Sequence, residues 1–166
     1  MRFRSWWRTA QIGGLVIRCK KAESVGGTMP ALYVTKEHTM ILVAGSANLD
    51  FVVRANHIPG PGETVLGRDF KTFPGGKGAN QAVACARAGG VTTHLLAGFG
   101  NDAFAAPIEA SLADAKVVLH AVRTDDEPTG TAFICVSDDA ENAITVAPGA
   151  NQALKPEHLP PLTGFT

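Results

Sequence analysis

From residue 40 onward the chain consists of apolar blocks, each about the length of one strand or one helix. Residues 40–45 form a continuous apolar run ending in glycine, which is typical of a strand buried on both faces of a parallel sheet. Residues 79–88 are strong helix formers and are followed by Gly89 and Gly90, which predict the end of a helix. Further apolar runs at 92–99 and 117–122 predict two more strands.

A second helix is expected between these last two strands, ending at about Ala115. Asp102 offers an N-cap for it, and Pro107 requires that the helix begins late, because an interior proline clashes with the carbonyl four residues earlier. The succession strand, helix, strand, helix, strand predicts an α/β domain with right-handed crossovers.

Two further blocks do not belong to this α/β alternation. In residues 51–73, the turn-rich stretch 58–62 is flanked by β-forming residues at 51–53 and 63–67, which are interpreted as short strands. Residues 131–136 and 143–146 flank an acidic stretch and read as a hairpin. We expect these pieces to form a separate small sheet that projects from the α/β part.

The charge distribution separates residues 1–39 from the rest of the chain. This segment holds seven of the 15 basic and only two of the 15 acidic residues, a net charge of about +5. The remaining 8 basic and 13 acidic residues give 40–166 a net charge of about −5. Residues 1–39 are interpreted either as a non-homologous, mis-read upstream stretch before a domain that starts at Met40, or as a transit-type leader.

Composition excludes several classes of protein. The 166 residues, 45% of them hydrophobic, suit one soluble globular domain, and there is no apolar run near the roughly 20 residues of a membrane span. Three widely spaced cysteines favour neither a disulfide framework nor a zinc site and point to a reducing compartment. A formal net charge of +0 argues against a nucleic-acid partner.

Asn48 and Asp50 are the first candidates for ligand binding. They follow the strand predicted at 40–45, and ligands of open α/β sheets bind beyond the carboxyl ends of the strands. One residue separates them, so an extended backbone points both side chains to the same side, where their donors and acceptors could hold vicinal hydroxyls. Both residue types are also common turn formers after a strand, and that alternative stays open.

A glycine-rich string at residues 75–80 precedes the first predicted helix and supplies Gly76, Lys77 and Asn80. Glycines let the backbone approach a ligand closely, and a helix N-terminus offers unpaired N–H groups. The string lacks the spacing and the Ser or Thr of a Walker A loop, and it is not a G-x-G-x-x-G motif. Lys77 also suits an exposed loop lysine and Asn80 a helix cap, so the residues indicate a polar small-molecule site and no more.

The order of the motifs resembles the N-terminal part of the ribokinase branch of the PfkB carbohydrate kinase family, from about residue 40 to 159. The motifs are GSxNxD at 45–50, PGET at 61–64, GGKGANQA at 75–82, GxD at 100–102, TG at 129–130 and GAN at 149–151. The family pattern has its glycine after this helix one residue earlier, so that either Gly89 or Gly90 would fill that role.

The resemblance implies a doubly wound α/β domain with a β-sheet lid formed by segments 51–73 and 131–146. It implies transfer of the ATP γ-phosphate to D-ribose, giving ribose 5-phosphate and ADP, with Mg²⁺ and a monovalent cation (K⁺). Asn48, Asp50, Gly76, Lys77 and Asn80 would bind the sugar, and the lid would support a homodimer. Another PfkB-type sugar or nucleoside kinase, or a non-catalytic fragment that binds sugar or dimerises, remains the alternative.

The family's catalytic base, nucleotide pocket and cation sites belong to later motifs. Neither Gly-Ala-Gly-Asp nor Asn-x-x-Glu occurs in the 166 residues, so we expect a domain truncated before its nucleotide-binding half and inactive alone. Asp114, Asp125 and Asp126 are interpreted as surface charges and not as substitutes for the base. The thiols and a cytosolic metabolite as substrate favour the cytoplasm.

Overall fold

The computed structural model describes residues 7–12, 15–20, 40–163 and 165. Strands β1 (Trp7–Ile12) and β2 (Leu15–Lys20) pair as an antiparallel hairpin. This hairpin belongs to a compact unit separate from residues 38–165. The interpretation of residues 1–39 as a leader or mis-read stretch stays a prediction, and residues 21–39 lie outside the described part.

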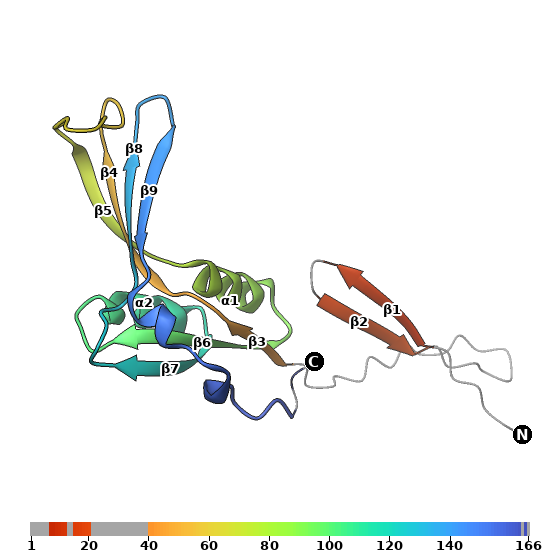
Figure 1. Ribbon diagram of the computed structural model, residues 1–166. Coiled ribbons are helices and arrows are strands. Elements are labelled where there is room, and N and C mark those ends of the chain that lie inside the picture. Colours follow the sequence, from red (N-terminus) through yellow and green to blue (C-terminus); the bar gives the residue numbers. More distant parts are fainter. Residues whose placement is uncertain (1–6, 13–14, 21–39, 164, 166) are drawn as a thin grey trace, which may run out of the picture. The chain divides into compact units, whose positions relative to one another are not determined.

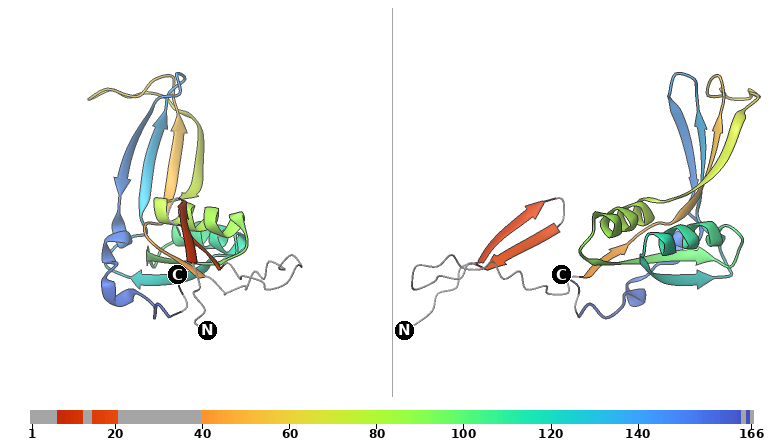
Figure 2. Two further views of the ribbon diagram at one scale, coloured as in Figure 1. Left: turned by 90° about the vertical axis from the view of Figure 1, so that its right-hand side faces the viewer. Right: turned by 180° about the vertical axis from the view of Figure 1, so that it is seen from behind.

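A three-stranded parallel sheet forms the base of the second unit, as the apolar runs predicted. Its strands are β3 (Met40–Ala44), β6 (Thr92–Gly100) and β7 (Val118–Thr124), in the order β3-β6-β7. Helix α1 (Lys77–Ala88) connects the projecting strands described below to β6, and α2 (Ala105–Asp114) connects β6 to β7. Both helices lie on the same face of this sheet (Figures 1 and 2).

The core lies between this sheet and the two helices. On β6, alternate side chains Leu95, Ala97 and Phe99 are fully buried and pack with Ile108 and Leu112 of α2. This alternation follows from the period of two in a strand, and the apolar run of β6 continues on the other face because that face is buried too. There the 3-10 helix η1 (Gly149–Ala153) covers β6, and a shorter one, η2 (Pro156–His158), follows.

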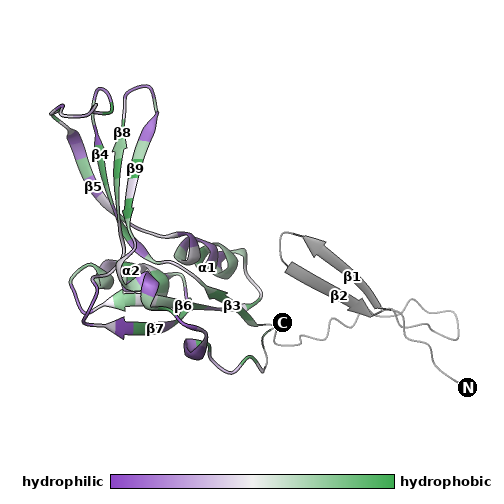
Figure 3. Cartoon of the chain, viewed as in Figure 1, coloured by the Kyte–Doolittle hydropathy of each residue, from purple (hydrophilic) through white to green (hydrophobic). Residues whose placement is uncertain are grey.

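Four more strands make a second sheet that projects from the base, here called the projecting sheet. Its order is β5 (Arg68–Gly75), β4 (Asn48–Arg54), β8 (Thr131–Val136) and β9 (Asn142–Ala147). The central pair β4/β8 is parallel and both outer pairs are antiparallel. Apolar segments run along β4 and β8, while the outer strands alternate in hydropathy (Figures 1 and 3).

The α/β class, the separate second sheet and the acidic hairpin between β8 and β9 are confirmed. Pro107 occupies the third position of α2, in the first turn, as its ring requires. The N-cap of α2 is Phe104 and not Asp102, but Asp102 Oδ1 still accepts hydrogen bonds from the N–H groups of Phe104 (2.9 Å) and Ala105 (3.3 Å) at the start of the helix. No helix among the described residues is long and apolar enough to cross a membrane.

Some predicted boundaries are wrong. Residues 63–67 are not a strand; β5 begins at Arg68 and runs to Gly75, into the string expected to be a loop. Phe70 and Phe73 are three residues apart and lie on opposite faces of β5, so the sequence has no clear alternation here; the strand is formed by its pairing with β4, which runs as far as Gly75. Helix α1 begins at Lys77 and not at Ala79, since Gly76 takes the N-cap position.

Candidate functional site

Asn48 and Asp50 lie at the start of β4, just beyond the carboxyl end of β3. The Gly45 N–H donates to the Leu96 carbonyl of β6 (3.0 Å), so the chain leaves the base sheet at this edge. Asn48 and Asp50 are therefore part of a projecting strand, not of a turn, and the extended backbone puts both side chains on one face of it. Asn48 is buried, with 8% of its surface exposed, and Asp50 is half-buried.

Gly75 and Gly76 pack directly against these two residues. Gly75 pairs with Asn48 in the β4/β5 ladder, and a Cβ on Gly75 would overlap the Asp50 carboxylate. Gly76 has φ +93°, and a Cβ on it would lie 2.8 Å from the Asn48 nitrogen. Glycine is required at both positions, because any side chain would displace the β4 strand or clash with the carboxylate.

Lys77 and Asn80 lie in the first turn of α1, which starts beside this edge. The N–H of Ala79 donates to the Ser46 carbonyl (3.0 Å) and ties the helix to the segment between β3 and β4. The Asn80 N–H makes an ordinary helical bond to the Gly76 carbonyl (2.9 Å), so Asn80 is not the helix cap. Both side chains are exposed at the surface, which leaves them available to a ligand.

Burial raises the pKa of the Asp50 carboxyl above its ordinary value. In its carboxylate form Asp50 offers acceptor oxygens only. The pair therefore combines a strong acceptor, Asp50, with an amide, Asn48, which is the composition that recognises hydroxyl groups.

Asp102 connects the neighbouring loops through hydrogen bonds. Its Oδ2 accepts the N–H of Thr129 (2.7 Å), while Thr129 Oγ1 accepts the N–H of Gly100 (3.1 Å). Partial burial alone would raise the pKa of Asp102, but hydrogen bonds from Thr129, Phe104 and Ala105 outweigh it and lower the pKa below its ordinary value. The other acidic candidates are exposed surface residues, as expected: Asp114, Asp125 and Asp126.

Asn151 is a part of the site to which no role was assigned from its residue type or spacing. It lies in η1, about a hundred residues from Asn48, and its Nδ2 donates to Asn48 Oδ1 (2.9 Å). In the sequence, Asn151 was noted only as the last residue of the GAN motif at 149–151. Among the described residues no group of three or more His, Cys, Asp or Glu side chains could hold a metal ion.

Comparison with known proteins assigns this arrangement to a family. The model of the pfkB family of carbohydrate kinases matches residues 38–163, most of the chain. The chain belongs to the pfkB family. The matched range includes both sheets of the second unit and every residue of the site described above.

Individual pfkB relatives are ribokinases. A ribokinase of Lactococcus lactis subsp. lactis is 42% identical over 121 residues, which are 73% of this chain and 40% of that protein. The solved ribokinase of Giardia lamblia is 33% identical, with a TM-score of 0.67 over 72% of this chain and 37% of its own. An Arabidopsis thaliana ribokinase, solved in complex with ribose and ATP, is 34% identical, with a TM-score of 0.60 over 68% and 36%.

The chain thus spans about 40% of the length of the curated pfkB relatives that it matches. The mixed α/β fold with two sheets matches the solved structures of these relatives over the part that the chain covers.

Proposed function

We propose that this chain forms the sugar-binding part of an ATP-dependent ribokinase-type kinase, which transfers the γ-phosphate of ATP to D-ribose and yields ribose 5-phosphate and ADP. The observation that carries the proposal is the pair Asn48 and Asp50 on one face of β4, set against the glycines that begin α1. In this proposal Asn48, Asp50, Gly76, Lys77 and Asn80 contact the sugar.

The neighbours of Asp50 in the projecting sheet suit the apolar side of a sugar. Ala132 of β8 is paired with Asp50, and Val146 of β9 is paired with Ala132, so the three side chains stand in one row on the same face. A sugar ring presents hydroxyls at its edge and C–H groups on its faces. Asp50 would bind the hydroxyls while the apolar row packs on the C–H groups and excludes water.

Calorimetry with a panel of ligands tests the proposed substrate. We expect D-ribose to give saturable heat with the purified chain and D-fructose and adenosine to give none, with circular dichroism showing in parallel that the chain is folded. Tighter binding of fructose or adenosine would support the alternative, another PfkB-type sugar or nucleoside kinase. A folded chain that binds none of the three would contradict the sugar site.

ATP, Mg²⁺ and a monovalent cation are proposed for the whole enzyme, following the family resemblance. The described residues provide no cluster of metal ligands, and the later family motifs are missing from the sequence. We therefore place no metal-dependent or nucleotide-dependent step on these residues. Their proposed contribution is to orient the hydroxyls and to exclude water from the sugar.

The 166-residue chain alone is expected to have no kinase activity. Phosphoryl transfer requires an activated nucleophile and stabilisation of the transferring charge, and the resemblance assigns both to motifs that this sequence lacks. The assay is ATP-dependent formation of ribose 5-phosphate by the purified chain. Activity that co-purifies with the chain and is lost on Asp50→Ala would contradict the expectation, leaving a non-catalytic sugar-binding or dimerising role without support.

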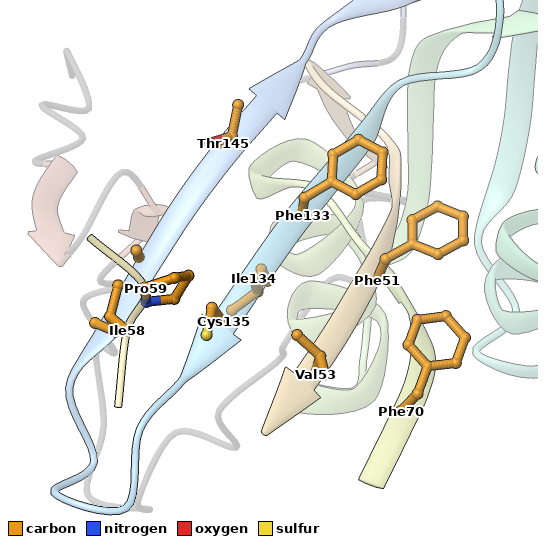
Figure 4. A pocket seen from close by; sticks show the side chains of 10 residues that line it. Phe51, Val53, Ile58, Pro59, Phe70, Phe133, Ile134, Cys135 and Thr145 are labelled. Atoms are coloured by element: carbon orange, nitrogen blue, oxygen red, sulfur yellow. The ribbon is translucent and has the colours of Figure 1, made fainter. Parts of the chain in front are cut away.

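We further propose that the projecting sheet acts as the lid and pairs with that of a second copy. On the face away from Asp50, the rings of Phe51, Phe70 and Phe133 lie on three adjacent strands (Figure 4). Phe51 stacks on Phe133 with ring centroids 5.4 Å apart, and Phe133 is 53% exposed. They border a hollow of about 430 Å³ in this face.

An exposed apolar hollow of this kind is typical of a protein interface. Sedimentation of the wild-type chain and of Phe133→Asp tests the lid proposal. We expect the wild type to be a dimer and the Phe133→Asp variant to be a monomer. Both should still bind D-ribose. A wild type that is monomeric at high concentration would contradict the pairing.

The cytoplasm is the proposed location, in keeping with the free thiols of Cys85 and Cys135.

A further inference from the structure

The side chain of Asn151 makes four hydrogen bonds, three of which connect η1 to the residues at the start of β4. Its Oδ1 accepts the N–H of Ala47 (2.9 Å). Its Nδ2 donates to three oxygens, which are Asn48 Oδ1 (2.9 Å), the Pro148 carbonyl (2.9 Å) and the Ala47 carbonyl (3.2 Å). One amide thus satisfies groups that are about a hundred residues away along the chain.

These contacts fix which end of the Asn151 amide faces which partner. A backbone N–H can only donate, so the atom facing Ala47 N must be the oxygen of the amide. The nitrogen then faces three acceptors. In the opposite orientation the amide nitrogen would face the N–H of Ala47 and the amide oxygen would face three other oxygens, so these hydrogen bonds would be lost. The orientation of Asn151 is therefore determined by the backbone and not by Asn48.

The fixed orientation of Asn151 also determines that of Asn48. Because Asn151 presents a donor, Asn48 must present its Oδ1 to it, and the Nδ2 of Asn48 points elsewhere. Among the residues that the structure describes, none accepts a hydrogen bond from this Nδ2. Asn48 as a whole is only 8% exposed, but its Nδ2 is not a buried atom and is open to solvent, so a ligand can reach this free donor.

The backbone around the two amides leaves little room for another arrangement. A Cβ on Gly130 would lie 2.5 Å from Asn48 Oδ1 and 2.9 Å from the Pro148 carbonyl, so Gly130 packs directly beneath the pair. The N–H of Leu49 donates to the Gly130 carbonyl (2.9 Å), and the N–H of Ala150 donates to the Pro128 carbonyl (2.8 Å). Both ends of the Asn48–Asn151 bond are thus held by the main chain.

We propose that Asn151 is a positioning residue that sets Asn48 as a hydrogen-bond donor toward the sugar. The pair on β4 then offers one donor, Asn48 Nδ2, and one acceptor, the Asp50 carboxylate, to neighbouring hydroxyls. A vicinal diol matches this polarity, since one hydroxyl oxygen accepts from Asn48 while the other hydroxyl donates to Asp50. This inference rests on the proposed sugar site and adds the polarity of its recognition.

Two variants separate positioning from a merely structural role. Asn151→Asp keeps the shape and the acceptor for Ala47 N–H but opposes a carboxylate to Asn48 Oδ1. The Asn48 amide should turn over, and its oxygen would then face the hydroxyl. We expect D-ribose affinity to fall about tenfold, because the hydroxyl oxygen loses the donor that Asn48 supplied and the hydroxyl must compete as a donor beside the second acceptor, Asp50. Asn142→Asp, the same chemical change at an exposed position of β9, should leave the affinity unchanged.

A double-mutant cycle shows whether Asn151 acts through Asn48. In an Asn48→Ala background, Asn151→Asp should weaken D-ribose binding by less than twofold, because the group that it positions is gone. Thermal melts of each variant monitor the fold. Equal losses of affinity in both backgrounds would overturn the positioning role, and so would unchanged affinity in folded Asn151→Asp.

A measurement on the wild type keeps the inference testable should a variant not fold. In ¹H–¹⁵N spectra the side-chain NH₂ signals of Asn48 should shift as D-ribose is added, with the same saturation as the heat. Saturable ribose binding that leaves these signals unmoved would overturn the inference alone. The absence of saturable binding by the folded wild type would overturn the proposed sugar site and the inference together.

Discussion

Replacing Gly78 by alanine should destabilise the protein, although alanine is the better helix former. Gly78 is the second residue of α1, and its backbone touches the segment that leaves β3. A Cβ at this position would lie 2.6 Å from the carbonyl carbon of Gly45, 2.8 Å from its Cα and 2.8 Å from the Ser46 nitrogen. All three atoms belong to the main chain, so no side chain can turn away to make room.

The size of the effect follows from the displacement that the new methyl group demands. An ordinary contact begins at 3.4 Å and the closest atom lies at 2.6 Å, so α1 and the Gly45–Ser46 segment must separate by about 0.8 Å. Overpacking against a rigid partner costs up to about 3 kcal/mol, and the helix propensity of alanine returns up to about 1 kcal/mol. We expect a net loss of about 1–2 kcal/mol in the free energy of unfolding, a fall of several degrees in Tm.

The control is Ala84→Gly, at an exposed position of the same helix. It should destabilise the protein by about 0.5–1 kcal/mol through helix propensity alone. Stability should therefore fall both when glycine is replaced by alanine at position 78 and when alanine is replaced by glycine at position 84. Urea unfolding followed by circular dichroism measures both. A Gly78→Ala protein as stable as the wild type, beside a destabilised Ala84→Gly protein, would show that α1 is not seated against the Gly45–Ser46 segment and would refute the geometry of the site.

Three further changes have a definite expected sign. Asp50→Asn should raise Tm at pH 7 while abolishing D-ribose binding. Burial raises the pKa of the Asp50 carboxyl, so the wild type loses stability as pH rises through the folded pKa and the carboxyl becomes charged. The gain of the Asp50→Asn variant over the wild type should therefore vanish in acid, and a lower Tm of the variant at pH 7 would contradict this. Asp102→Asn should cost about 1–3 kcal/mol at pH 7, because the N–H of Thr129 loses its acceptor. The pKa of Asp102 is lowered, so its stabilisation is lost as pH falls through the folded pKa, and wild type and variant should converge in urea titrations as the pH falls below the ordinary aspartate range. Lys116→Gly should stabilise by about 1 kcal/mol, because Lys116 has φ +60° just after α2; a lower urea midpoint would count against it.

The base of the fold could be predicted because its signals are local. The long apolar run of β6 is buried on both faces, and Pro107 restricts the start of α2 to a single turn. The apolar run of β3 also forms the expected strand, but β3 lies at the edge of the sheet and is only half-buried, with Ala44 exposed, so its burial on both faces was wrongly predicted. The projecting sheet was harder to delimit. In β5 the apolar residues Phe70 and Phe73 are exposed, and the strand is held by its ladder to β4, which composition does not reveal.

The site was only partly visible for the same reason. The spacing of Asn48 and Asp50 predicted a common side, which the start of β4 provides, and the glycine string predicted a close backbone approach, which Gly76 shows with φ +93°. The role of Asn151 could not be predicted from its residue type. Its partner is Asn48, and the two meet only after η1 has folded over the end of the base sheet.

The central claim is that Asn48 and Asp50 form a sugar site at the junction of the two sheets. The most direct test is the binding isotherm of D-ribose for the purified chain and for Asp50→Ala, with circular dichroism of both samples. The account predicts saturable heat for the wild type, loss of that heat in the variant and the same folded spectrum for each. Saturable heat that is unchanged in Asp50→Ala, or a folded wild type that gives none, would contradict it.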